Sequence, residues 1–260
     1  MRLLACTLLL GLIATPALAS RSATAAAPAY AALPGGTFAS VLPADGKSAP
    51  AEIAPFKLRT EPVTNAQFLA FVRRHPQWQR GKVASALADD RYLSHWAAPD
   101  ALGEVALPQQ PVTRVSWFAA NAYCEAQGAR LPTWYEWERV SAADRTRADA
   151  RSDPAWRQQI LDWYARPANG TLPDVGRGEP NYFGVRDIHG LVWEWVEDLG
   201  SMMVSGDNRE QGDPDLKKFC GSGALSLEQK DNYAMLMRIA TLSSMQASYT
   251  STTMGFRCAK

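Results

Sequence analysis

Cysteine and histidine are the residue types best suited to nucleophilic, redox or metal chemistry, and this chain has few of them. Its cysteines are Cys6, Cys124, Cys220 and Cys258, and its histidines are His75, His95 and His189. No two histidines have the His-x-x-x-His spacing of a zinc site, and the chain has no Gly-rich phosphate loop, Gly-x-Ser-x-Gly elbow or Cys-x-x-Cys pair. The pattern argues against a mononuclear zinc or iron centre held by histidines.

The N-terminus indicates which thiols remain in the mature protein. Arg2 precedes an apolar run from Leu3 to Thr15, and Ala17-Leu18-Ala19 has the small-x-small pattern of a cleavage site. A membrane span needs roughly 20 apolar residues, and this run is shorter. We therefore expect residues 1–19 to be a signal peptide cleaved near Ala19, and a mature chain with no membrane span, located in the periplasm or secreted.

In an oxidising compartment, the three cysteines that follow the leader indicate one disulfide and one free thiol. The sequence alone allows three pairings. Loss of Arg2 with the leader leaves equal numbers of basic and acidic residues, so the charge predicts no nucleic acid as partner.

The elements that must position any site are short. Residues 20–33, rich in Ala, Ser and Pro, predict a flexible lead-in, and residues 34–260 a single domain. Capping signals predict four helices: Asn65 and Ser116 are the N-caps of the first two, the Thr133-x-x-Glu136 capping box opens the third, and Asp153-Pro154 starts the fourth. Gly, Pro, Asn and Asp recur between them, so we expect an irregular, loop-rich α+β fold.

Three motifs, in order and spacing, resemble the formylglycine-generating enzyme family, also called sulfatase-modifying factors. They are Val115-Ser116-Trp117 leading into Arg130-Leu131-Pro132-Thr133-x-x-Glu136-Trp137-Glu138, Asp187-Ile188-His189-Gly190-Leu191-Val192-Trp193-Glu194-Trp195, and Gly255-Phe256-Arg257-Cys258. The resemblance begins at Pro34-Gly35-Gly36-Thr37-Phe38 and so covers nearly the whole mature domain. It implies a compact fold related to C-type lectins.

The resemblance also implies particular bonds and ligands. In the family, the cysteines matching Cys124 and Cys258 form a disulfide. The turn that matches Asp187 to Glu194 holds Ca²⁺, which implies carboxylates from Asp187 and Glu194 and carbonyls from Gly190 and Val192. A second family disulfide would join positions 141 and 239, which are Ser141 and Ile239 here.

The copper site is where this sequence departs from the family. Its oxidases bind Cu(I) through two cysteines five residues apart, and soft thiolates suit that ion. The matching positions hold Gln229 and Ala234, which argues against the usual copper chemistry. Met235 and Met237 are soft thioethers beside the second position, and they leave open either a rebuilt copper site or a buried core.

The last segment, from Phe219 to Met254, would face a ligand in this fold. Its candidate ligand-binding residues are Arg238, Ser226, Ser243 and Tyr233, with Cys220 as a candidate catalytic thiol. Arg238 could shape a recessed pocket for a peptide or small anion, or make a structural salt bridge. Cys220 could be reactive, or buried and inert.

The whole pattern resembles exported family members found beside copper nitrite reductase and siderophore-maturation functions. Three hypotheses follow from this resemblance. The first is a periplasmic accessory or maturation factor that binds a protein segment or a metallo-enzyme partner such as a copper enzyme. The second is a copper-dependent oxidase of a protein cysteine with a displaced site, and the third is a lectin-like binding module.

Overall fold

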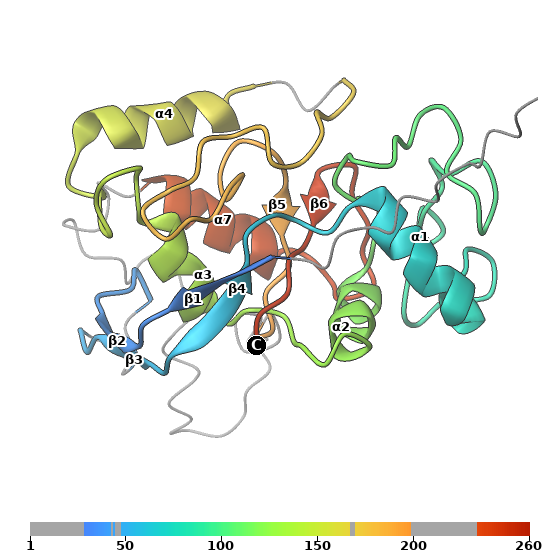
Figure 1. Cartoon of the computed structure of the whole chain (residues 1–260), viewed down its shortest axis with the longest axis horizontal. Coiled ribbons are helices and arrows are strands. Elements are labelled where there is room, and N and C mark those ends of the chain that lie inside the picture. The colour runs from blue at the N-terminus through green and yellow to red at the C-terminus, as the bar shows by residue number, and fades with distance from the viewer. Residues whose placement is uncertain (1–28, 43, 45–47, 167–169, 199–232) are drawn as a thin grey trace, which may run out of the picture.

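The computed structural model describes residues 29–42, 44, 48–166, 170–198 and 233–260. Its strands are short and form three two-stranded sheets, two antiparallel and one parallel (Figure 1). The pairs are β1 (Tyr30–Leu33) with β4 (Phe56–Arg59), β2 (Gly36–Phe38) with β3 (Ala51–Ile53), and β5 (Trp193–Glu194) with β6 (Met254–Gly255). No described helix is long and apolar enough to cross a membrane.

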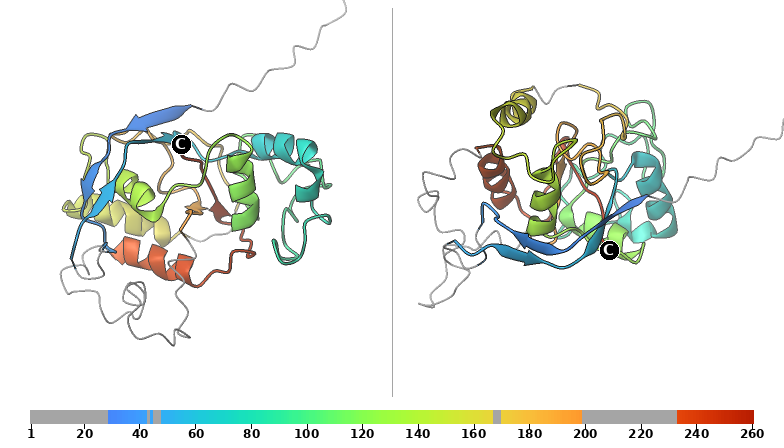
Figure 2. Two further views of the ribbon diagram at one scale, coloured as in Figure 1. Left: turned by 90° about the horizontal axis from the view of Figure 1, so that it is seen from below. Right: turned by 60° about the vertical axis from the view of Figure 1, so that its left-hand side comes forward.

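Helices are distributed around these sheets. They are α1 (Asn65–Arg74), the 3₁₀ turn η1 (Pro76–Trp78), α2 (Trp117–Glu125), α3 (Trp134–Ser141), α4 (Pro154–Tyr164) and α7 (Tyr233–Ser243). Both views of Figure 2 show α4 and α7 beside each other at one end of the molecule, with α1 and α2 toward the other. This mixture of helix and strand confirms the predicted loop-rich α+β fold.

The capping residues explain where the helices begin. Ser116, Thr133 and Asp153 each accept a backbone N–H bond at the start of α2, α3 and α4, and Thr133 with Glu136 completes the predicted capping box. The first helix begins one residue earlier than expected, because Thr64 is its N-cap and Gln67 closes a second capping box.

The N-terminal boundary of the folded part also differs from the expectation. Residues 30–33, expected within the flexible lead-in, form β1 and pair in register with residues 56–59. Composition alone did not reveal this strand, because its small residues are held by backbone hydrogen bonds to β4 rather than by a large apolar side-chain pattern.

Indole N–H groups join the two central motifs across the core. Trp195 donates to the carbonyl of Val115 at 3.0 Å, and Trp117 donates to the carbonyl of Val196 at 2.7 Å. Beside them, a Cβ on Gly255 would lie 2.8 Å from the carbonyl oxygen of Val112, so only glycine allows β6 to approach this closely. These contacts explain why the motifs have small and aromatic residues at fixed spacing.

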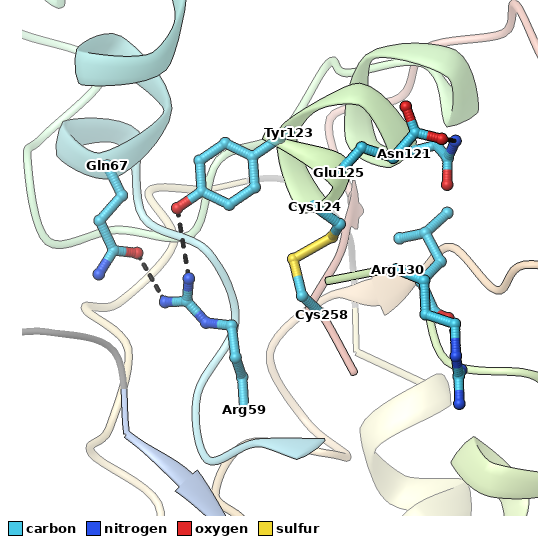
Figure 3. Close-up of a disulfide and its surroundings, with 9 residues drawn as sticks. Arg59, Gln67, Asn121, Tyr123, Cys124, Glu125, Arg130 and Cys258 are labelled. Carbon is cyan, nitrogen blue, oxygen red and sulfur yellow. Dashed lines mark hydrogen bonds between the residues drawn. A yellow bond between two sulfur atoms is a disulfide. The ribbon is translucent and has the colours of Figure 1, made fainter. Parts of the chain in front are cut away.

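The predicted disulfide is present. Cys124 on α2 bonds to Cys258 in the C-terminal segment, with Cα atoms 5.6 Å apart, and both residues are fully buried (Figure 3). Beside it, the Arg59 guanidinium donates to Gln67 and to the hydroxyl of Tyr123. The bond therefore fastens the chain terminus to the α1–α2 side of the core.

Breaking this bond should destabilise the protein strongly. The two cysteines are 134 positions apart, and in the chain-entropy model a link across so long a loop stabilises by about 5 kcal/mol. Urea denaturation of the wild type should show a loss of that order on adding reductant. The double variant Cys124→Ala/Cys258→Ala should start at the lower stability and ignore reductant. Equal midpoints for oxidised and reduced wild type would contradict the prediction.

A buried acid, Glu138 on α3, has a perturbed pKa. Its carboxylate accepts from the backbone N–H of Val41 at 2.9 Å and from the hydroxyl of Ser40, and Arg151 lies 3.8 Å away. Burial outweighs these favourable contacts and raises the pKa of Glu138 to about 7. The acid is therefore protonated in the folded protein at pH values where it ionises in the unfolded chain.

Glu138 should make the protein less stable as pH rises. Between pH 4.5 and about 7 the folded state binds more protons at this site than the unfolded state, so the free energy of unfolding falls across that window. Relative to Glu138→Gln, the wild type should lose about 2 kcal/mol between roughly pH 5 and pH 8. Urea midpoints of both proteins measure this difference, and the comparison cancels the opposite contribution of neutral buried histidines. Parallel pH profiles would contradict it.

Candidate functional site

A buried ion pair occupies the centre of the region that the sequence singled out. Arg257 and Glu194 are both fully buried, and the closest nitrogen–oxygen distance between them is 2.8 Å. The indole N–H of Trp137 donates to the same carboxylate at 2.8 Å. Arg257 makes its remaining bonds to the backbone carbonyls of Arg59, Thr60 and Arg186. Both buried charges therefore have ionic and hydrogen-bond partners that replace the water they lost on burial.

Arg238 joins α7 to this ion pair. Its guanidinium carbon lies 3.5 Å from the ring centroid of Trp137, and one of its nitrogens donates to the backbone carbonyl of Glu194 at 2.6 Å. The side chain is only 1% exposed, and burial lowers its pKa to about 10. Its Nε is buried without a hydrogen-bond partner among the described residues. The sequence left open a recessed polar pocket around Arg238 or a structural salt bridge. In the structure Arg238 is buried and makes structural contacts to the Glu194 carbonyl and the Trp137 ring.

His189 is the residue of this region that the sequence reasoning did not select. Its Nε2 lies 2.7 Å from the carbonyl oxygen of Ser141, and its ring meets Trp137 and Trp156 edge to face. Burial lowers the pKa of His189 to about 4, and its Nδ1 has no hydrogen-bond partner in the part of the chain that the structure describes. The neutral ring therefore donates from Nε2 to Ser141. The only available signal was its place inside the Asp187–Trp195 motif.

The two carboxylates predicted to hold calcium, Asp187 and Glu194, both accept hydrogen bonds from the protein. Both carboxylate oxygens of Glu194 accept bonds from Arg257 or Trp137. Asp187 instead accepts the backbone N–H groups of Gly176 and Gly178. Glu194 is the only carboxylate that pairs with Arg257 among the described residues, and calcium binding beside this pair stays a prediction. No group of three or more His, Cys, Asp or Glu side chains in the described ranges could hold a metal ion.

Gly190 and Val192, the predicted carbonyl ligands, have structural environments as well. Gly190 has a positive φ of 92° and turns the chain beneath Trp163. Val192 is buried next to Gly255. The Asp187–Glu194 turn is thus held by aromatic packing and by donors from the protein itself.

The two methionines beside the matched copper position point in different directions. Met235 is buried, with its sulfur 3.9 Å from the hydroxyl of Ser141, whereas Met237 is 39% exposed. They do not converge on one ion, so the expectation of a buried core methionine is right for Met235. The contact also places the end of α3 against α7, at Ser141, the position where the family has a cysteine of its second disulfide.

Several predicted residues cannot be placed together. Cys220, Ser226 and Gln229 lie outside the described residues, as do the side chains of Tyr233 and Ala234. Ser243 donates to the carbonyl of Ala240 in its own helix at 3.1 Å. Of the two predicted ligand-binding residues whose side chains the structure describes, Arg238 therefore belongs to the buried cluster and Ser243 bonds within α7.

The sequence model of the family described as "Sulfatase-modifying factor enzyme 1-like domain" matches residues 15–260. The chain belongs to this family. It is 29% identical to the formylglycine-generating enzyme of Streptomyces coelicolor over 304 residues, covering 94% of each protein. It is 28% identical to the inactive C-alpha-formylglycine-generating enzyme 2 of Mus musculus over 214 residues, or 65% of this chain and 68% of that protein.

Among solved structures, the chain is similar to PvdO from Pseudomonas aeruginosa, with a TM-score of 0.46 and 17% identity. The match covers 89% of this chain and 94% of that one.

The melting temperature tests the calcium prediction. If calcium binds at Asp187 and Glu194, the wild type should melt at a higher temperature in millimolar calcium than in excess chelator, because the ion stabilises the folded state. Glu194→Gln should lower the free energy of unfolding by about 3–5 kcal/mol even in chelator, since it leaves Arg257 buried without its partner. Differential scanning calorimetry measures both effects. A wild-type melting temperature that is the same in calcium and in chelator would contradict the calcium prediction.

Proposed function

We propose that this protein is a periplasmic accessory or maturation factor that binds a protein segment without the two-cysteine copper oxidation of its family. One observation carries the proposal. Ala234, at the position of the second copper cysteine, lies on α7, where Met235 points into the core and Met237 points outward. No thiolate and no converging pair of thioethers is therefore available on this helix.

The location is part of the same proposal. The apolar leader with its Ala17-Leu18-Ala19 pattern supports export, and the bond between Cys124 and Cys258 suits an oxidising compartment. A relative described as inactive, in Mus musculus, supports the idea that this scaffold can serve without the oxidase reaction.

The outer side of α7 is the surface that we assign to the partner. Arg238 and Met235 fix the inner side of the helix against Trp137 and Ser141. Met237, 39% exposed, is then presented outward as an adaptable apolar side chain of the kind that suits peptide contacts. In this role Arg238 is a positioning residue, because it holds the helix without facing the partner.

The alternative function is a copper-dependent oxidase acting on a protein cysteine. The names of relatives such as the Streptomyces coelicolor formylglycine-generating enzyme favour it. It would need Cys220 to supply the thiolate that positions 229 and 234 lack. A lectin-like module is the third possibility. The two experiments below, taken together, distinguish the three functions.

The first test is an anaerobic Cu(I) titration of the purified protein against a competing chelator. We expect no tight one-to-one binding, and no oxidation of a cysteine peptide when oxygen is admitted. Tight binding that Cys220→Ser abolishes, together with turnover of the peptide, would overturn the proposal in favour of the oxidase.

The partner is tested separately by capture from a periplasmic extract of the source organism. Met237→Glu should reduce retention of a specific protein at least several-fold, because it places a charge on the proposed face. The matched control is Val105→Glu, which adds the same charge at a residue 70% exposed in a loop away from α7, and it should retain the partner. Equal losses in both variants would contradict a binding face on α7. A thermal shift with a saccharide and no captured protein would favour the lectin-like module.

A further inference from the structure

A second group of chemically capable side chains lies in the loops that connect α1 to α2. It consists of Arg80, Ser94, His95 and Arg114, which we call the Ser94 cluster. None of these residues belongs to the motifs of the family resemblance or to the buried ion pair at Glu194. The cluster is partly exposed to solvent, whereas Arg238 and Arg257 are enclosed.

Two guanidinium groups from distant segments meet at one serine. Arg80 donates to the backbone carbonyl of Ser94 at 3.2 Å and to that of Ala97 at 3.5 Å. Arg114 donates to the hydroxyl of Ser94 at 2.6 Å. Ser94 itself is exposed, so the shared anchor of the two cations faces solvent.

The positive charge of this cluster is not compensated by the described residues. Neither Arg80 nor Arg114 forms an ion pair within those ranges, whereas Arg91 is paired with Asp89. Asp89 also accepts two bonds from Thr250, so its oxygens are already in use. Burial, followed by the charges of Arg114 and Arg80, lowers the pKa of His95 to about 4. The imidazole is therefore neutral mainly because it is buried, and the two nearby cations add to this effect.

The backbone around the cluster is held in an unusual conformation. Leu93 and Arg114 have φ values of 47° and 52°, in the left-handed region that side chains other than glycine avoid. They are tied together, because the N–H of Leu93 donates to the carbonyl of Arg114 at 2.9 Å and that of Arg114 donates to Ser251 at 2.8 Å. These bonds fix the backbone of Arg114 relative to the backbone next to Ser94, and such strained conformations gather at functional sites.

We propose that the Ser94 cluster is an oxyanion-binding site, in which Arg80 and Arg114 hold a carboxylate or phosphate group above Ser94. Guanidinium forks match the geometry of both groups, and bonds to ionised acceptors are stronger than neutral ones. The shared chemistry is a small, multiply coordinated oxyanion. It could be a free ion or an acidic side chain of a bound peptide. The inference does not depend on the proposed function, because it concerns a different surface from α7.

The test is a titration of the purified protein at low ionic strength, followed by the NMR resonances of the His95 ring. Inorganic phosphate, glutarate and a hexaglutamate peptide are the three probes. Each anion that binds should shift the His95 signals and raise the measured pKa of His95, since it neutralises the two cations beside the ring. A larger shift at lower concentration with hexaglutamate would identify an acidic segment as the ligand, whereas stronger binding of phosphate would identify a free ion.

The variants decide whether the site is specific. Arg80→Gln and Arg114→Gln should each weaken binding at least tenfold, and the double variant should abolish it. Arg73→Gln is the matched control, because this exposed arginine on α1 donates to the carbonyl of Asp100 and lies outside the cluster. Arg114→Lys keeps the charge but loses the fork, and it tests the geometry if Arg114→Gln does not fold.

Two results would overturn the proposal. In the first, none of the three anions changes the His95 resonances or its pKa. In the second, Arg73→Gln weakens binding as much as Arg80→Gln, which would mean that the anions respond to the general charge of the surface.

Discussion

The buried ion pair between Glu194 and Arg257 is the interaction on which the rest of the structure depends. Removing two charges from water costs several kcal/mol per ion, and only a fully bonded pair recovers that cost. Here Trp137 adds a donor to the carboxylate, and three backbone carbonyls accept from the guanidinium. The pair therefore joins β4, β5, α3 and the chain terminus in one network. β5 and β6, two residues each, could not hold these segments alone.

The position of α7 follows from the same network. Arg238 reaches the backbone of Glu194 and stacks on Trp137, so the helix is oriented by a residue that the ion pair has already fixed. The inner side of α7 therefore packs against the core, and its outer side is the side that could contact the proposed protein partner. A ligand pocket centred on Arg238 would have to break this stack. The oxyanion-binding site that we propose lies instead at Ser94 and Arg114, which are accessible to solvent.

The sequence predicted features that depend on local patterns. Capping residues located α1 to α4 within one residue, and the motifs indicated the family, the fold and the Cys124–Cys258 bond. It did not predict α7, although Met235, Arg238 and Leu242 recur at helical spacing and are buried. Nor did it predict that Glu194 would pair with Arg257, because 63 residues separate them and only the fold brings them together.

The same constraint explains how this scaffold could lose one chemistry and keep its shape. The groups that stabilise the fold are Glu194, Arg257, Trp137 and the disulfide, and none of them depends on a thiolate at position 229 or 234. Alanine at position 234 is among the best helix formers, so its presence in α7 favours the helix that Arg238 anchors. Substituting the copper ligands therefore costs the fold little. The fold alone does not determine function, so the proposed binding role depends on surface residues such as Met237 on the outer side of α7.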